Sequence, residues 1–427
     1  MLRRRSVHFA LLSALFLLLV PAAAMAKTGP CRPDGSGPKC QVWTGKVTSI
    51  NDGDTFAVDI AGDGKKRSYA IRFIGVQAME QTRYNKDPKK RRGECHALQA
   101  TNLVEKMVRQ AHGRVRLTAQ RPRTDTRGRL LRSVNLRIGG RWVDVGEQEM
   151  ATGVTLWMHN NHESAWNKIY NRLGQTAARQ GIGIWNKTTC GVGPAQDVPL
   201  KVWVMSDPFG DDNRNKNAEW IRVQNLSPTK TVSLARWWVR DSGHRLFKFP
   251  GRTSLSPGEA LIVHVGRGRS SGNSYYWGLT DTIFENSVNG DDVGDGAYLF
   301  DPKGDLRAWL VYPCLVSCSD PNQGAVRVIA HPSGREYVRV MNVSGHSVDL
   351  FGYQLRMPGA YAFPRGTVLD PGDDVEVDVG GNPANDSSRV LHMGMSGLYL
   401  VDRGGAVSVA TFDEIDLACD SWGNGHC

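Results

Sequence analysis

Apolar and polar residues alternate through the first third of the chain, and three segments there have a helical period instead. The alternation predicts strands at 41–60 (with a turn at 51–54), 67–76, 114–120 and 130–140. Helical periods cover residues 93–111, 144–153 and 162–180. Few strands with a helix inserted among them predict a small closed barrel of the OB type, five-stranded and decorated by three helices.

The second half of the chain has short β-branched runs, frequent turns and an internal repeat. "EWIRVQNLS" from Glu219 matches "EYVRVMNVS" from Glu336, and "FPGRTSLSPGEALIVHVG" from Phe249 matches "FPRGTVLDPGDDVEVDVG" from Phe363. The matched segments lie roughly 115 residues apart, which is the size of a domain rather than of a solenoid repeat. The pattern predicts two copies of one all-β sandwich with Pro-Gly turns.

The two copies resemble lamin tail domains, which occur in lamins and in exported bacterial enzymes. The shared features are the E-[WY]-[VI]-x-[VI]-x-N strand, the F-P…L-x-P-G turn, and the late segments "YLFDPKGDL" and "YLVDRGGAV". The resemblance covers residues 196–315 and 322–420, and the first copy is closer to the family pattern. It implies two immunoglobulin-like β-sandwiches.

The chain begins with a segment that is typical of a secretory signal peptide. Three arginines precede a short apolar run, and Ala24 and Ala26 flank Met25 as in an A-x-A cleavage site. An uncleaved anchor is the alternative, but the run is short for a membrane span and a cleavage site follows it. We therefore expect a secreted protein that begins near Lys27, with no membrane span in the mature chain.

Export makes the eight cysteines candidates for disulfides, because exported proteins fold in an oxidising setting. Their spacing does not fix the connectivity. Three close pairs suggest themselves and would leave Cys95 with Cys190: Cys31–Cys40, Cys314–Cys318 and Cys419–Cys427. A zinc site is the rival interpretation, but paired C-x-x-C units are missing.

Charge is divided unevenly along the chain. Residues 320–427 hold seven arginines, no lysine and fourteen acidic residues, a net charge of −7, whereas the full chain carries +11. A basic front half in an exported protein indicates a polyanionic partner, either nucleic acid or an acidic cell-wall polymer.

Five motifs follow one another in the front half: "DGDT" (52–55), the segment 72–80, "GECHALQAT" (93–101), "RTDTRGRLL" (123–131) and "NHESAWNKIYNRLGQTAARQGIGIWN" (161–186). As an ordered set they resemble the staphylococcal nuclease (thermonuclease) family. The resemblance implies hydrolysis of DNA and RNA phosphodiester bonds, with 3′-phosphate products.

The resemblance also implies the roles of individual residues. Glu80 corresponds to the general base, Arg72 and Arg129 to the arginines that bind the phosphate, and Asp54 to a calcium ligand. Phosphodiester hydrolysis needs residues of these types. A carboxylate must deprotonate the attacking water, and guanidinium groups and a divalent cation must stabilise the charge on the phosphate. Singly, Arg72 and Glu80 would fit ordinary structural roles; Asp52 is expected to cap the turn.

The chain departs from its family after Val76. The family has Asp-Thr-Pro-Glu there, and this chain has Gln77-Ala78-Met79-Glu80. Gln77 offers calcium only a neutral amide oxygen, which binds it less strongly than a carboxylate. In the family, the backbone carbonyl of the threonine binds calcium. Ala78, at the same position, can still provide that carbonyl. We expect an active enzyme with a weakened or altered site for a divalent cation, calcium by resemblance.

Other residues are candidates for contacts with nucleic acid. The basic segment 83–94 contains Lys89, Lys90, Arg91 and Arg92, which fit a phosphate-tracking loop, although a solvated surface loop is the plain alternative. Arg127, Tyr84 and Trp157 are candidates for contacting or stacking on bases. Residues 207–219 resemble a calcium loop only loosely, because Lys216 stands at the glycine position and the final glutamate is missing, so we expect a turn-rich loop.

Together these patterns predict a secreted nuclease with C-terminal modules for binding or targeting. One rival is a catalytically silent protein that binds nucleic acid or a cell surface, and another makes the tandem modules, bound to a surface polymer, the main function. The expected parts are a signal peptide (1–26), a stapled N-terminal loop (27–41), the nuclease-like domain (42–187) and the two lamin tail domains (196–318 and 322–427).

Overall fold

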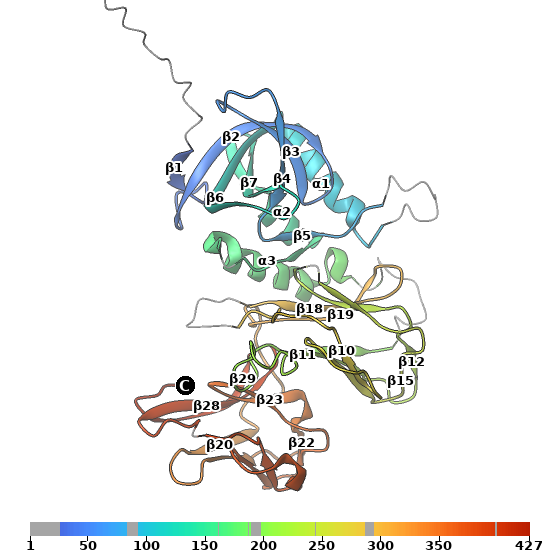
Figure 1. Cartoon of the computed structure of the whole chain (residues 1–427), viewed down its shortest axis with the longest axis vertical. Coiled ribbons are helices and arrows are strands. Elements are labelled where there is room, and N and C mark those ends of the chain that lie inside the picture. Colours follow the sequence, from blue (N-terminus) through green and yellow to red (C-terminus); the bar gives the residue numbers. More distant parts are fainter. Residues whose placement is uncertain are drawn as a thin grey trace, which may run out of the picture.

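The computed structural model describes residues 26–82, 93–160, 162–186, 188, 198–243, 245–286, 294–397 and 399–427. In Figure 1 a barrel, a first sandwich and a second sandwich follow one another along the long axis. Several sequence-based predictions lie outside the described residues: the signal peptide before Ala26, and Tyr84, Lys89, Lys90, Arg91, Arg92 and Cys190.

The front half contains the predicted five-stranded barrel. Each strand pairs with the next in the order β2-β3-β4-β7-β6, and β6 pairs back onto β2, which closes the barrel. The β4–β7 pairing is parallel and the other pairings are antiparallel. The barrel strands are β2 (Lys39–Ile50), β3 (Thr55–Ile60), β4 (Ser68–Phe73), β6 (Arg114–Thr124) and β7 (Leu130–Ile138).

Four further strands were not expected from the sequence. β1 (Lys27–Pro30) pairs with the start of β2, and β8 (Arg141–Asp144) pairs with β7. The segment 27–41, expected to be a loop, is therefore a hairpin that Cys31–Cys40 closes. β5 (Val76–Ala78) and β9 (Thr155–Trp157) form a separate two-stranded sheet.

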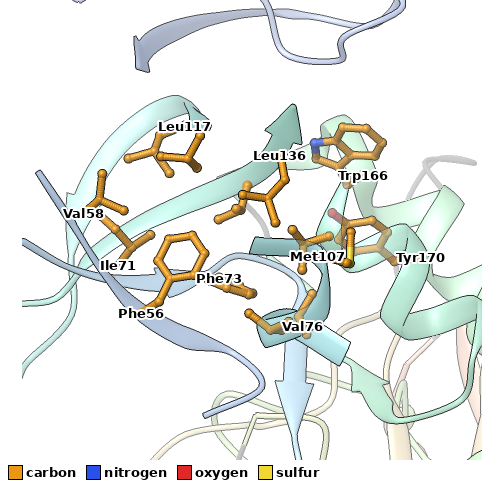
Figure 2. Packing of buried hydrophobic residues seen from close by; sticks show 14 of the residues in the cluster. Phe56, Val58, Ile71, Phe73, Val76, Met107, Leu117, Leu136, Trp166 and Tyr170 are labelled. Atoms are coloured by element: carbon orange, nitrogen blue, oxygen red, sulfur yellow. The ribbon is translucent and has the colours of Figure 1, made fainter. Parts of the chain in front are cut away.

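The alternating pattern of the strands fills the barrel with apolar side chains. Phe56, Val58 and Ile71 are fully buried, and the rings of Phe56 and Phe73 meet edge to face with centroids 4.7 Å apart. Figure 2 shows these side chains gathered between the strands, with Trp166 and Tyr170 closing one side. Burial of each such side chain contributes about 1.5–3 kcal/mol, so the barrel has a core of its own.

The three predicted helices are present: α1 (Ala97–Gln110), α2 (Val145–Ala151) and α3 (Asn167–Gln180). The 3-10 turns η2 (Ser164–Trp166) and η3 (Gly183–Trp185) flank α3. Asp144 caps α2, where its carboxylate accepts a hydrogen bond from the Glu147 N–H. None of the helices among the described residues is long and apolar enough to span a membrane.

The two sandwiches have the same strand order. The first contains the sheets β10-β11-β16-β17 and β14-β13-β18-β19 with the pair β12-β15, and the second repeats this as β20-β21-β26-β27 and β24-β23-β28-β29 with β22-β25. Even the parallel pairing at the sheet edge recurs, in β16–β17 and in β26–β27. The internal repeat in the sequence thus corresponds to a repeat of the fold.

The first sandwich consists of β10 (Leu200–Met205), β11 (Trp220–Asn225), β12 (Val232–Ser233), β13 (Trp238–Asp241), β14 (Leu246–Lys248), β15 (Ser254–Leu255), β16 (Ala260–His264), β17 (Ser274–Tyr276), β18 (Gly296–Phe300) and β19 (Leu306–Val311). The second consists of β20 (Val326–His331), β21 (Tyr337–Asn342), β22 (Val348–Asp349), β23 (Tyr353–Met357), β24 (Gly359–Ala362), β25 (Val368–Leu369), β26 (Asp374–Asp378), β27 (Val390–His392), β28 (Gly404–Thr411) and β29 (Asp416–Gly423), with the 3-10 turns η5 (Leu350–Gly352) and η6 (Pro383–Asn385).

Polar residues of the repeated motif make equivalent hydrogen bonds in both sandwiches. Glu219 and Glu336 are buried and accept hydrogen bonds from the backbone N–H groups of Ile283 and Tyr399. The motif's final asparagine, Asn225 or Asn342, donates from its amide to carbonyls at the ends of neighbouring segments. The matching residues therefore fix matching connections.

Replacing Asn225 by alanine should destabilise the first sandwich. Its amide donates to the carbonyls of Lys230, Leu255 and Ser256, and its carbonyl accepts from the Ser227 N–H. Leaving such buried groups without partners costs about 1–3 kcal/mol, to be measured by urea unfolding of the chain. The exposed Asn215→Ala should change stability by less than about 0.5 kcal/mol, and equal effects of the two substitutions would contradict this role.

Apolar contacts join the three bodies. Trp185 of the barrel part packs against Tyr298 and against Trp309, whose ring centroid lies 5.0 Å from its own, and Figure 1 shows α3 beside β18 and β19. Between the sandwiches, the buried Arg222 guanidinium of the first lies 4.0 Å from the Phe351 ring of the second and donates to the Phe351 carbonyl at 2.8 Å. Through the contacts of Trp185, the barrel part packs directly against the first sandwich.

The three close disulfides are formed as predicted: Cys31–Cys40, Cys314–Cys318 and Cys419–Cys427. Cys95 is also disulfide-bonded, while Cys190, its expected partner, lies outside the described residues. Such bonds indicate an extracellular or otherwise oxidising environment.

Candidate active site

Asp54 lies at the centre of a hydrogen-bond network at one end of the barrel. It ends the turn before β3, and its side chain is buried. One carboxylate oxygen, Oδ1, accepts from the Thr55 hydroxyl at 2.8 Å. The other, Oδ2, accepts from the Ala78 N–H at 2.9 Å and lies 3.3 Å from an Arg72 guanidinium nitrogen. Protein donors thus surround both oxygens.

Arg72 reaches this network from β4, where it stands opposite Thr55 in the β3–β4 ladder. It is 4% exposed, and both terminal nitrogens are used within the protein. Nη1 donates to the carbonyls of Phe73 and Val76, and Nη2 donates to the Gln77 side-chain oxygen at 2.6 Å. The arginine therefore ties β4 to β5 in addition to compensating the charge of Asp54.

Gln77 and Ala78 enter the network from β5. Gln77 has no exposed surface, and its side-chain nitrogen donates to the Ala78 carbonyl at 2.7 Å and to Asp54 Oδ2 at 3.4 Å. Its orientation follows from its partners, because arginine can only donate and a backbone carbonyl can only accept. The Gln77 amide consequently touches all three neighbours: Arg72, Asp54 and Ala78.

Arg129 joins the network from the tight turn before β7. Its Nη1 donates to the Thr55 hydroxyl at 3.2 Å, and its Nε pairs with Asp125 at 2.7 Å. Its other terminal nitrogen, Nη2, has no hydrogen-bond partner among the described residues, and the side chain is about a quarter exposed (24%). Unlike Arg72, it keeps a donor for a ligand.

Asp125 orients Arg129 and was not singled out in the sequence. Besides the side-chain pair, its carboxylate accepts from the backbone N–H groups of Arg127 and Arg129, both at 2.9 Å. Burial alone would raise the pKa of Asp125, but these bonds from Arg129 and Arg127 lower it below its usual value. It therefore stays ionised and holds the arginine in place.

Glu80 follows the network, two residues after Ala78. Its side chain is exposed, and its backbone N–H donates to the Glu94 carboxylate at 2.8 Å. Even so, burial by the surrounding protein, together with the carboxylates of Asp54 and Glu94, raises the pKa of Glu80 above its usual value. A carboxylate with a raised pKa is better suited to accept a proton near neutral pH.

Glu80 and Asp52 line one cavity of about 560 Å³, together with Ser49, Ile50, Asn51, Gln81 and Thr82. Asp52 caps the turn, as predicted, by accepting a hydrogen bond from the Asp54 N–H at 3.0 Å. Burial and the charge of Asp54 raise the pKa of Asp52 to about 7. Asp52 is thus a second titratable group beside the cavity, whereas only a structural role was expected from the sequence.

Glu149, on α2, is a further carboxyl group that sequence reasoning missed. It has no exposed surface, and neither of its oxygens has a hydrogen-bond partner among the described residues. Burial and the nearby carboxylates of Asp54 and Asp144 raise the pKa of Glu149 well above its usual value. Burial without hydrogen-bond partners thus favours the protonated, neutral form of Glu149. A glutamate within a helix gives no sequence signal for such burial.

One family comparison bears on the first sandwich. Residues 204–314 match the family model of the Lamin Tail Domain. A search of curated proteins found no match to the chain. The match falls on the first of the two copies, which is also the closer to the family pattern in the sequence.

The lamin tail domain touches the segment next to Glu80. The Cys95 N–H donates to the carbonyl of Gly304, in the β18–β19 turn, at 3.2 Å, and a side chain at Gly304 would collide with Glu94. Arg240, on β13, is 4% exposed, and its positive charge lowers the pKa of both Glu80 and Glu94, against the larger effect of burial. The lamin tail domain thus supplies part of the surroundings of Glu80.

The structure also places three other candidates from the sequence, Arg127, Trp157 and the segment 207–219. Arg127 is exposed and can contact a ligand. Trp157 cannot stack on a base, because it is 2% exposed and packs in the barrel core. The segment 207–219 forms turns around Asp211, whose carbonyl accepts from the backbone N–H groups of Arg214 and Asn215, as expected for a turn-rich loop.

A cavity of about 640 Å³ lies where α3 and both sandwiches meet. Arg179, Lys201 and Trp203 line it, but so do the carboxylates of Asp320 and Asp413. Those carboxylates would repel a phosphate, and the cavity contains none of the site residues predicted from the sequence. The cavity beside Glu80 is therefore the better candidate for phosphodiester chemistry.

Proposed function

We propose that the protein is a secreted nuclease that hydrolyses phosphodiester bonds of DNA and RNA at the barrel end where Glu80 lies. The observation that supports this most is the joining of residues far apart in the sequence. Arg129, Thr55, Asp54, Arg72, Gln77 and Ala78 form one continuous network. Glu80 follows this network in the chain and lines a cavity, and Arg129, which has an unused donor, joins the network through Thr55.

In this proposal Glu80 takes the proton from the attacking water, and its raised pKa supports that role. Arg129 binds the phosphate and stabilises the charge that develops on it. Arg72 holds the site together, because its terminal nitrogens already serve protein acceptors. Arg127 and the basic segment around Lys89–Arg92 track the rest of the strand.

We also propose that residues 322–427 are a second lamin tail domain. Its strands follow the same order as those of the first sandwich, and its Glu336 and Asn342 make the same kinds of hydrogen bonds as Glu219 and Asn225. Both modules would serve to bind or target a surface polymer or nucleic acid. Secretion is proposed from the signal-like segment and agrees with the disulfides.

The proposed reaction is tested by the chemical ends of its products. The chain from Lys27 onward, incubated with 5′-labelled DNA and RNA oligonucleotides, should yield shorter fragments that end in a 3′-phosphate. Treatment with a 3′-phosphatase should then shift their mobility. Fragments that all end in a 3′-hydroxyl would contradict the family resemblance, and intact oligonucleotides would contradict the proposed function itself.

Replacing Arg240 by methionine should shift the pH dependence of cleavage. Arg240 lowers the pKa of Glu80 and Glu94, so its removal raises both values. Because a general base must be deprotonated, the acid limb of the kcat/KM profile should move to higher pH. The exposed Arg252→Met removes the same charge from the same domain and should leave the limb unmoved. Coincident limbs in both variants would exclude an effect of the lamin tail domain on the base.

A further inference from the structure

Of the three residues expected to bind calcium, two, Asp54 and Ala78, are already bridged by the side chain of the third, Gln77. Asp54 Oδ2 and the Ala78 carbonyl both accept hydrogen bonds from the Gln77 side-chain nitrogen, at 3.4 and 2.7 Å. Both hydrogens of the amide therefore point at the two oxygens that a cation would join. The amide oxygen of Gln77 is also used, since it accepts from Arg72 at 2.6 Å.

The donor set does not fit a calcium ion in this arrangement. Calcium takes about six to eight oxygen ligands at about 2.3–2.6 Å. Here the Asp54 carboxylate accepts from Thr55, Gln77 and Ala78 and pairs with Arg72. Within the part of the chain that the structure describes, no three His, Cys, Asp or Glu side chains form a metal-binding group.

The balance of charge leads to the same conclusion. An aspartate at position 77 would place two buried carboxylates beside one arginine, and the excess negative charge would favour a cation. Glutamine leaves Asp54 and Arg72 as a neutral pair, 3.3 Å apart and almost fully buried. The nearby Glu149 adds no charge when protonated, and burial raises its pKa well above the usual value. The pair itself therefore supplies no excess negative charge that would favour a divalent cation.

We propose that the Gln77 carboxamide takes the place of the divalent cation, so that this network is held together without a metal ion. The amide N–H groups join Asp54 to the Ala78 carbonyl and the amide oxygen fixes Arg72. These hydrogen bonds keep β5 against the barrel, and with it the chain that leads to Glu80. The catalytic consequence, cleavage without calcium, rests on the nuclease function proposed above, whereas the binding consequence does not.

Calcium titration of the chain from Lys27 onward tests the binding consequence by calorimetry. The wild-type protein should show no saturable binding at this site below about 1 mM calcium, and Gln77→Asp should bind at least about tenfold more tightly. Gln148→Asp, which adds the same carboxylate at an exposed position of α2, should behave like the wild type. Introducing Asp54→Asn shows whether any calcium that binds does so here.

The proposal is overturned by either of two results. One is tight calcium binding by the wild-type protein that Asp54→Asn abolishes. The other is a folded Gln77→Asp variant that binds calcium no more tightly than Gln148→Asp. Should Gln77→Asp fail to fold, the wild-type titration with and without Asp54→Asn still decides between the two views.

Cleavage in EDTA tests the catalytic consequence. The wild-type rate in EDTA should stay within about twofold of its rate in calcium, and Gln77→Asp should be stimulated by calcium at least about tenfold. Loss of wild-type cleavage in EDTA with recovery in calcium would overturn the proposal. Absence of cleavage under every condition would count against the nuclease function instead, and the calorimetry would still test the role of Gln77.

Discussion

Replacing Glu80 by glutamine should lower the rate of nucleic-acid cleavage by at least about a hundredfold with little loss of stability. Glutamine has almost the same shape as glutamate, but it cannot accept a proton from water. The side chain of Glu80 is exposed beside a cavity, so the substitution leaves the barrel core untouched. Initial rates on DNA, with circular dichroism as a check on folding, measure the effect.

A matched control separates loss of the base from loss of negative charge. Glu105, on α1, pairs with Arg109 on the helix surface, and Glu105→Gln removes one charge from the same part of the chain. That variant should keep its rate within about twofold, because exposed pairs contribute little. A Glu80→Gln protein that cleaves as fast as Glu105→Gln would remove Glu80 from the catalytic role.

The pH dependence of the wild-type enzyme follows from the same residue. Burial, Asp54 and Glu94 raise the pKa of Glu80, so the base becomes protonated, and inactive, at a higher pH than an ordinary glutamate would. The acid limb of the rate profile should therefore lie above the usual glutamate range.

Replacing Arg72 by methionine should destabilise the barrel by about 3–5 kcal/mol and abolish cleavage. The substitution keeps much of the side-chain volume but leaves the Asp54 carboxylate, the Gln77 amide oxygen and two backbone carbonyls without their shared donor. Buried acceptors that lose a charged partner in this way are costly. Differential scanning calorimetry of the full chain would show the barrel transition moving to lower temperature.

The control for Arg72 is an arginine of the same part of the chain that makes only a surface pair. The Arg109 side chain is 70% exposed and lies 3.7 Å from Glu105. Arg109→Met should therefore change stability by less than about 1 kcal/mol. If Arg72→Met were as stable as Arg109→Met, the network would not be what holds β4 and β5 together.

Much of the architecture could be predicted because the barrel strands and sandwich repeats carry strong patterns. Residues such as Phe56, Val58 and Ile71 alternate with polar or small neighbours along their strands, and α1 and α3 each keep a helical period for several turns. β5 and β9 escaped prediction because three residues are too few to establish a period. β1 escaped because a Gly/Pro-rich segment has the composition of a loop.

Several members of the network, but not their connections, could be named from the sequence. The sequence singled out Asp54, Arg72, Gln77, Ala78 and Arg129, which the fold brings into one network. That Gln77 would direct its amide at Asp54 and Ala78 depends on the pairing of β5 with β9, which no local pattern shows. The sequence therefore identified a missing carboxylate without showing what replaces it.

The effects on Glu80 of residues from other parts of the chain could not be predicted from the sequence. Glu94 matters because its carboxylate accepts from the Glu80 N–H, and Arg240 because the lamin tail domain packs beside it. Both relations arise from tertiary contacts. The contact between Cys95 and Gly304 joins residues more than two hundred positions apart, beyond any sequence window.

The most direct test of the central claim is DNA cleavage by the purified chain from Lys27 onward, measured side by side in calcium, magnesium and EDTA. We expect phosphodiester cleavage that persists in EDTA and is lost in Glu80→Gln. No cleavage under any of the three conditions, together with tight and salt-sensitive binding of DNA, would contradict it and make the barrel a nucleic-acid-binding domain.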